Sequence, residues 1–207
     1  MLTQAAAKQV LIKITDILKS LGLTYWIDSG TLLSAYRDKN INLFDHDLDI
    51  RTFIDEFNDD LIGEYFKLAW KSGFNWFEAY QLPFSQILTC HENKTVVDLK
   101  LCYRDKEHIW YYCWNDPNPM PILHVYPVRF FETFGSIELL GNGYPCPQPI
   151  EEYLNYHYGP DWRQFKARAE QADESDFTWD YMKSPPCAMT LQEFWVLKGD
   201  YPYVLFG

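Results

Sequence analysis

The sequence lacks a long hydrophobic run, and its first residues do not show the pattern of a signal peptide. No stretch approaches the roughly 18 consecutive apolar residues that a membrane-spanning helix needs. The N-terminal residues MLTQAAAKQVLIKI also lack the basic start and the uninterrupted apolar run of a signal peptide. We therefore expect a soluble, cytoplasmic protein without a membrane span, unless an anchor lies outside this sequence.

Basic residues are scarce. Lys and Arg number 18 against 29 Asp and Glu, which gives a net charge of −11. Proteins that bind nucleic acid need basic patches to displace the counterions of the phosphate backbone. The charge balance therefore argues against nucleic acid, and against an anionic membrane surface, as the main partner. A phosphate-bearing ligand must be met locally, by a metal ion or by a few placed basic residues.

Cysteines are few and widely spaced. Their odd number and the absence of any CxxC pair argue against a zinc site and against a disulfide framework. We expect buried, reduced thiols. The five positions are Cys90, Cys102, Cys113, Cys146 and Cys187.

Hydrophobic and aromatic residues are abundant and can form a large core. Hydrophobic residues make up 47% of its 207 residues and aromatic residues 18%, which excludes a disordered protein. Helical and strand-like patterns alternate without a long linker or an internal repeat. We therefore expect a single α/β (α+β) domain over residues 1–207, with a mixed sheet flanked by helices and a helical C-terminal part.

The hydrophobic periodicity predicts the order of the elements. Helical spacing is found in residues 4–21, 31–37, 55–72 and from Pro149 to Gly159, and Thr190 with Glu193 could cap a closing helix. Strand patterns are found in residues 24–28, up to 51, 74–80, 84–90, 95–103, 108–114 and 122–140.

Three aspartates alternate along the second predicted strand. In an extended chain Asp45, Asp47 and Asp49 share one face, and Leu48 and Ile50 lie on the other. An exposed, merely acidic face is the simpler interpretation, but such faces seldom carry three uncompensated carboxylates. A divalent cation relieves their repulsion, and hard cations such as Mg²⁺ or Mn²⁺ prefer carboxylate oxygens. The pattern therefore favours a metal site.

A fourth carboxylate lies inside a later strand. Asp98 alternates with the apolar Val97 and Leu99, and an isolated buried charge is costly, so Asp98 must be paired or liganded. Lys100 on the same face is one partner for a plain ion pair. The alternative is that Asp98 completes a site with Asp47 and Asp49, and that Lys100 contacts a substrate phosphate.

The tripeptide Ser29-Gly30-Thr31 follows the first predicted strand and opens a helix. Backbone N–H groups at a helix N-terminus can hold an anion, and glycine allows the backbone to approach a phosphate closely. Such a turn alone is weak support. Upstream of an Asp-x-Asp strand it predicts phosphates held between the turn and a carboxylate-bound metal, as in phosphoryl or nucleotidyl transfer.

This order of strand, Ser-Gly turn, helix and Asp-x-Asp strand resembles the nucleotidyltransferase-fold superfamily. Within it, the segment WIDSGTLLSAYRDKNINLFDHDLDI looks like the LicD family, which includes phosphocholine transferases and fukutin-related protein. The later stretch PQPIEEYLNYHYGPDW is similar to the closing motif of that family. The resemblance covers about residues 24–162. Ser34 departs from the usual Gly, and Leu43-Phe44 from the usual Pro-Trp.

The resemblance implies a metal-dependent phosphotransferase. It would move a phospho-alcohol group such as phosphocholine from a CDP-linked donor to a hydroxyl of an acceptor, a carbohydrate (glycan) or a small molecule, and release CMP. Carried over by position, the metal ligands and catalytic acids are Asp47, Asp49 and Asp98, with Asp45 as a further ligand. The same comparison assigns donor binding to Ser29, Gly30, Thr31 and Arg37. Beside these, Lys100 is expected at a substrate phosphate, and Asp28, next to the turn, either binds an acceptor or donor hydroxyl or caps the strand end.

Two other functions fit the same residues. An NTP-dependent nucleotidyltransferase acting on a small molecule would use the same fold and carboxylates. A non-catalytic binding module would keep the fold without a metal, although the intact Asp47, Asp49 and Asp98 argue against it.

Overall fold

The computed structural model describes residues 3–42, 47–82, 85–92, 95–113, 122–164 and 188–190. Its helices are α1 (Gln4–Ser20), α2 (Ser29–Arg37), α3 (Asp59–Lys71) and α4 (Ile150–Tyr158). Its strands are β1 (Tyr25–Ile27), β2 (Asp47–Phe53), β3 (Trp76–Leu82), β4 (Ser85–Glu92), β5 (Thr95–Arg104), β6 (His108–Cys113), β7 (Ile122–Pro127), β8 (Gly135–Leu139), β9 (Asn142–Cys146) and β10 (Ala188–Thr190).

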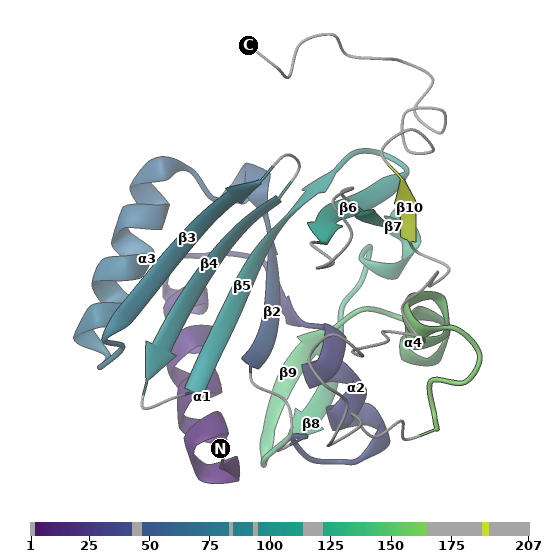
Figure 1. The fold of residues 1–207 in the computed structure, drawn as a ribbon, viewed down its shortest axis with the longest axis horizontal. Coiled ribbons are helices and arrows are strands. Elements are labelled where there is room, and N and C mark those ends of the chain that lie inside the picture. The colour runs from purple at the N-terminus through teal and green to yellow at the C-terminus, as the bar shows by residue number, and fades with distance from the viewer. Residues whose placement is uncertain are drawn as a thin grey trace, which may run out of the picture.

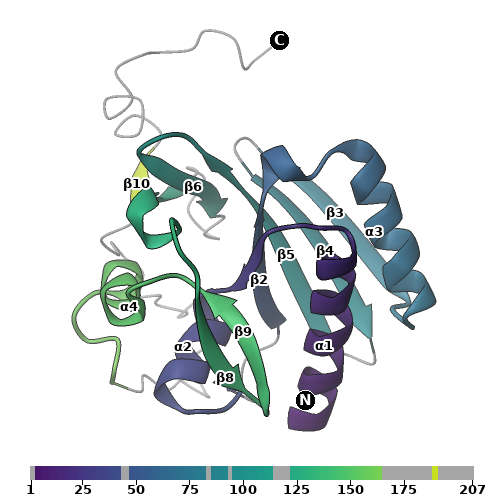
Figure 2. The same cartoon turned by 180° about the vertical axis from the view of Figure 1, so that it is seen from behind.

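A mixed sheet organises the described residues. Its path runs β1-β2-β5-β6-β7-β10, and β4 pairs with both β5 and β3. Strands β2 and β5 run parallel, and the neighbouring pairs are antiparallel. Helices α1 and α3 cover one face of β3, β4 and β5, and α2, α4 and the β8-β9 hairpin gather near β1 and β2 (Figures 1 and 2). The predicted mixed α/β fold is confirmed.

The helices begin where capping residues stand. The Thr3 side chain accepts a hydrogen bond from the Ala6 N–H and caps α1, whose apolar stripe is buried. The predicted helix over 55–72 begins later, because the Asn58 side chain accepts from the Leu61 N–H and caps α3 there. Among the helices described, none is both long and apolar enough to cross a membrane.

The strands alternate as the sequence predicts. Leu48 and Ile50 of β2, with Val97 and Leu99 of β5, are fully buried in the core. The residues between them, including Asp47, Asp49 and Asp98, therefore lie on the opposite face of the sheet. The polar residues of two neighbouring strands thus share one surface. The closing helix predicted after Thr190 lies outside the described residues, and Thr190 itself ends β10.

Candidate active site

The turn before α2 and the acidic strand are in direct contact. The Asp28 carboxylate accepts from the Ser29 N–H at 2.7 Å and caps α2. The Asp49 carboxylate accepts from the Gly30 N–H at 3.2 Å, and the Asp49 N–H donates to the Thr31 hydroxyl at 2.8 Å. Backbone and side chain of β2 therefore fix the N-terminus of α2. The two sequence features that predicted a phosphate site meet at one place.

Asp49 and Asp98 are neighbours across two hydrogen-bonded strands. They are register partners in the parallel β2–β5 pair, so their side chains leave the sheet on the same face. Asp47 lies on that face two residues earlier. Asp49 is only 6% exposed, whereas Asp98 is half-buried and accepts from the Thr89 hydroxyl of β4 at 2.7 Å. Three of the predicted carboxylates are thus brought to one surface.

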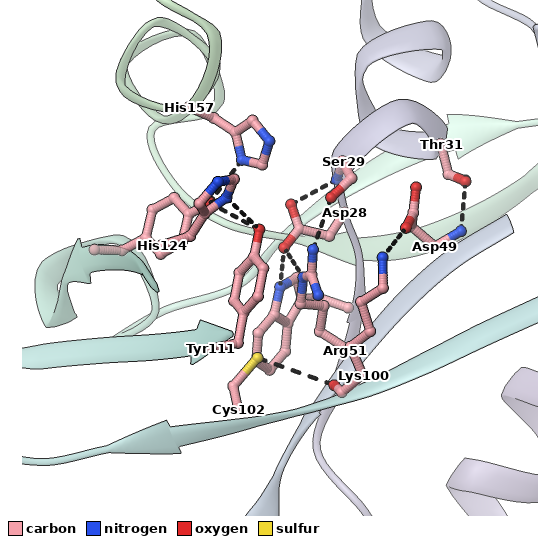
Figure 3. A network of polar contacts seen from close by, with 12 residues as sticks. Asp28, Ser29, Thr31, Asp49, Arg51, Lys100, Cys102, Tyr111, His124 and His157 are labelled. Atoms are coloured by element: carbon pink, nitrogen blue, oxygen red, sulfur yellow. Dashed lines mark hydrogen bonds and ion pairs between the residues drawn. The ribbon is translucent and has the colours of Figure 1, made fainter. Parts of the chain in front are cut away.

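Lys100 contacts the acidic strand directly. Its ammonium group donates to Asp49 Oδ1 at 3.1 Å, and the pair is largely shielded from solvent (Figure 3). Lys100 therefore forms an ion pair with Asp49, and its ion pair with Asp98 stays a prediction. A full positive charge therefore stands beside the carboxylates and close to the α2 N-terminus. This is a suitable place to attract a phosphate group.

The carboxylates fit a hard divalent cation by their chemistry. Asp49 and Asp98 lie side by side on neighbouring strands, and Asp47 shares their face, which is the all-oxygen donor set that Mg²⁺ and Mn²⁺ prefer. Within the described ranges, however, no three His, Cys, Asp or Glu side chains are already grouped to hold an ion. Asp45 lies outside the described residues. The metal site therefore stays a prediction.

Asp28 takes a structural role. It is 1% exposed, and its carboxylate accepts from Arg51 Nε at 2.7 Å and from the Tyr153 hydroxyl at 2.6 Å, besides the Ser29 N–H. Burial would raise the pKa of this carboxyl, but the charge of Arg51 leads the interactions that lower the pKa below its usual value. Asp28 caps the N-terminus of α2, and not the strand end that the sequence suggested. Its binding of a substrate hydroxyl stays a prediction.

Arg51 was not singled out from the sequence. Its side chain is 1% exposed, donates from Nη2 to the Ser29 hydroxyl at 2.8 Å, and stacks with Cζ 3.6 Å from the ring centre of Tyr111 (Figure 3). Its Nη1 has no hydrogen-bond partner, which the stacking on the ring offsets. Ser29 has a φ of +46°, a left-handed conformation that serine seldom adopts. Arg51 therefore holds the strained turn in place.

Arg37 lies at the far end of α2. Its Nε and Nη2 donate to the two carboxylate oxygens of the adjacent Asp38, both at 2.8 Å. At about 1.5 Å per residue, its backbone is on the order of 12 Å from the turn. The contact of Arg37 with a leaving phosphate stays a prediction.

Two histidines without an assigned role lie in a buried polar network behind Asp28. The Tyr126 hydroxyl lies 2.8 Å from His157 Nδ1, and the Tyr111 hydroxyl lies 3.0 Å from His124 Nδ1 (Figure 3). Burial lowers the pKa of His157 to about 4 and lowers the pKa of His124 well below its usual value. Both rings are therefore neutral at pH 7. They support the site as core residues.

The buried His157 makes stability depend on pH. In the unfolded chain His157 binds a proton below about pH 6.5, whereas in the folded protein its pKa is about 4. The unfolded state therefore holds more protons between these values, and the free energy of unfolding falls as the pH falls through this window. We expect a loss on the order of 3 kcal/mol. Urea unfolding of the wild type at pH 7 and pH 4.5 measures this loss. If the free energy of unfolding of a His157→Gln variant falls by as much as that of the wild type between these pH values, His157 is not the cause.

Comparison with known proteins agrees with the resemblance seen in the sequence. Residues 22–149 match the family described as LicD/FKTN/FKRP, nucleotidyltransferase domain. The chain is 26% identical over 190 residues to ribitol-5-phosphate transferase FKTN of Mus musculus, covering 90% of this chain and 37% of that protein. It is 30% identical over 158 residues to an uncharacterised protein of Rickettsia typhi, covering 72% of this chain and 44% of that protein.

This chain corresponds to only part of each relative. The chain spans less than half the length of either of these curated relatives. Among solved structures, ANT(2")-Ia in complex with adenylyl-2"-tobramycin has a TM-score of 0.40 and 15% identity, covering 72% of this chain and 76% of that one. A likeness at that level supports no conclusion about fold or function. The family match, in contrast, covers more than half of the chain and includes the turn, Asp49 and Asp98. The chain therefore belongs to the LicD/FKTN/FKRP nucleotidyltransferase-domain family.

Proposed function

We propose that this domain transfers a phospho-alcohol group from a CDP-linked donor to a hydroxyl group of a carbohydrate and releases CMP. The observation that carries the proposal is the junction of Asp49 with the α2 turn, beside its register partner Asp98. It places an anion-attracting helix N-terminus next to two carboxylates. Family membership, with relatives named as ribitol-5-phosphate transferases, supports the same class of reaction.

The donor diphosphate would lie over the N-terminus of α2. The N–H groups of Ser29 and Gly30 already donate to Asp28 and Asp49, so they do not form an open cradle. The turn instead attracts a diphosphate through the positive end of the helix dipole, with Thr31 at its first turn. Lys100 adds a full charge at the same place. Donor binding therefore depends on the helix terminus and Lys100 together.

The transfer itself is a displacement at phosphorus. The oxygen of the acceptor hydroxyl forms a bond to the phosphorus that carries the alcohol, and the bond from that phosphorus to the bridging oxygen breaks. CMP leaves with the electron pair of the broken bond. We assign the proton of the hydroxyl to Asp98, which lies at the surface end of the pair and keeps Thr89 as its hydrogen-bond donor.

The carboxylates would also bind the metal. Asp49 and Asp98, with Asp47 and Asp45, are the residues that would hold Mg²⁺ or Mn²⁺, and such an ion neutralises charge on the diphosphate. Lys100 would then share Asp49 with the ion, because its ammonium group contacts Asp49 Oδ1. With metal bound, one carboxylate would lie beside both a fixed and an exchangeable positive charge.

The reaction class can be read from the product. The protein is incubated with CDP-choline, CDP-ribitol or ATP, each with Mn²⁺ and a panel of sugars, and nucleotides are separated by chromatography. We expect CMP from a CDP-alcohol, its loss on addition of EDTA and its return with excess Mn²⁺. Release of pyrophosphate from ATP would instead support a nucleotidyltransferase, and the absence of any nucleotide product would support a binding module.

A further inference from the structure

The face of the sheet that carries Asp98 continues outward to the edge strand β3. No labelled helix lies over this face of β3, β4 and β5 in Figure 1, since α1 and α3 pack behind it. On β3, Phe77 packs against Phe66 of α3, so its neighbours Trp76 and Glu78 lie on the other face. Trp76 is 61% exposed. A large aromatic side chain is therefore presented to solvent on the same face as Asp98.

The strand registers align this edge with the carboxylates. Glu78 is the register partner of Thr89, Thr89 of Asp98, and Asp98 of Asp49. These four residues form one row across β3, β4, β5 and β2. With strands about 4.8 Å apart, Glu78 lies roughly 10 Å from Asp98. That span accommodates one sugar ring beside the Thr89–Asp98 contact.

Three side chains at this end of the row are held together. The Trp76 indole Nε1 donates to Glu78 Oε1 at 2.7 Å, which fixes the orientation of the ring. His91 is the register partner of Trp76, and its Nε2 lies 3.8 Å from the same Glu78 oxygen. His91 Nε2 is buried and has no hydrogen-bond partner. The cluster therefore combines an exposed ring face with a carboxylate that lies between an indole and an imidazole.

We propose that Trp76, Glu78 and His91 form a subsite for the acceptor, a neutral pyranose sugar. The apolar C–H face of a pyranose stacks on an exposed indole, and its hydroxyls can donate to Glu78, beside which His91 lies. The negative charge of Glu78 and Asp98 disfavours an acceptor that carries phosphate. This inference rests on the proposed function, because it makes the sugar the acceptor in that reaction.

The position of the subsite would allow the donor and the acceptor to meet at the row of register partners. The α2 turn contacts Asp49 at one end, and the Trp76 cluster lies at the other, with Asp98 between them. A donor on the Asp49 side and a sugar on the Glu78 side would bring the hydroxyl and the phosphorus together at Asp98. Neither substrate would need to cross the site of the other.

Trp70 provides a matched control for Trp76. It is 64% exposed, but it belongs to α3, and its ring packs against Phe77 on the opposite face of β3. The experiment records the indole N–H signals of ¹⁵N-labelled wild-type, Trp76→Ala and Trp70→Ala proteins by NMR. The signal missing from each variant assigns that residue. Neutral methyl pyranosides (methyl glucoside, methyl galactoside and methyl N-acetylglucosaminide) and glucose 6-phosphate are then titrated.

We expect at least one neutral pyranoside to shift the Trp76 signal and not that of Trp70. Trp76→Ala should weaken binding at least tenfold and raise the acceptor KM by a similar factor, while Trp70→Ala should match the wild type in both measurements. If the protein binds none of the sugars, or if Trp76→Ala binds as the wild type does, the subsite is wrong. If sugars bind at Trp76 but no CDP-alcohol is cleaved, the proposed reaction fails and the sugar site stands.

Discussion

Replacing Asp98 with asparagine is expected to reduce kcat/KM for CMP release about a thousandfold, or roughly 4 kcal/mol of transition-state stabilisation. Asparagine keeps an oxygen that accepts from Thr89, so the hydrogen bond at 2.7 Å survives. It removes the charge that would accept the proton of the hydroxyl and share the metal. Steady-state release of CMP from a CDP-alcohol measures the effect.

Stability separates this role from a structural one. Asp98 is half-buried and its substitution leaves the core unchanged, so we expect the free energy of unfolding to stay within about 1 kcal/mol of wild type. Asp55→Asn, which removes an exposed carboxylate paired with Arg104, serves as the control and should keep full activity. An Asp98→Asn enzyme that is fully active, or one that is inactive because it unfolds, would argue against a catalytic Asp98.

Replacing Arg51 with methionine is expected to lower the free energy of unfolding by about 3–5 kcal/mol, because breaking a buried ion pair leaves the other charge uncompensated. Arg51 and Asp28 are each 1% exposed, and their contact is 2.7 Å. The loss should also free the Ser29 turn, whose hydroxyl Arg51 holds. Urea unfolding at pH 7 measures the change.

An exposed arginine gives the comparison. Arg104 also pairs with carboxylates, at Asp55 and Glu56, but its side chain is partly exposed, and Arg104→Met should cost less than about 1 kcal/mol. Adding Asp28→Asn to Arg51→Met should cost less than the sum of the two single changes, because the uncompensated charge is then gone. Equal losses for Arg51→Met and Arg104→Met would mean that the buried pair contributes nothing special.

The acidic face was predictable because alternation along a strand depends only on local sequence. Leu48 and Ile50 on one side and Asp47 and Asp49 on the other follow from a period of two, and the structure places them so. The Ser29 turn was predictable for the same reason, since a strand, a small-residue turn and a helix follow each other directly.

Other features depend on which strands pair, and a single sequence does not contain that information directly. Arg51 is on the same predicted face as Asp49, but its partner Asp28 lies 23 residues earlier, next to β1. The row from Glu78 to Asp49 likewise requires three strand registers. The contact of Lys100 with Asp49 could not be chosen over one with Asp98 until β2 and β5 were known to be parallel.

Arg37 is expected at the donor because its position matches the family motif, and Asp28 because it adjoins the turn. Both roles stay predictions. In the folded chain Asp28 is enclosed by protein donors, and Arg37 is paired with Asp38 at the other end of α2. A motif conveys spacing along the chain, but the direction of a side chain depends on its neighbours in space.

The central claim is that Asp49 and Asp98 hold one divalent cation beside the α2 turn. Crystals soaked with Mn²⁺ and a CDP-alcohol, examined by anomalous diffraction, address it directly. We predict a manganese peak bridging Asp49 and Asp98, with the donor diphosphate against Ser29-Gly30-Thr31. A nucleotide bound with its manganese elsewhere, and Asp49 still bonded only to Lys100 and Gly30, would contradict the account.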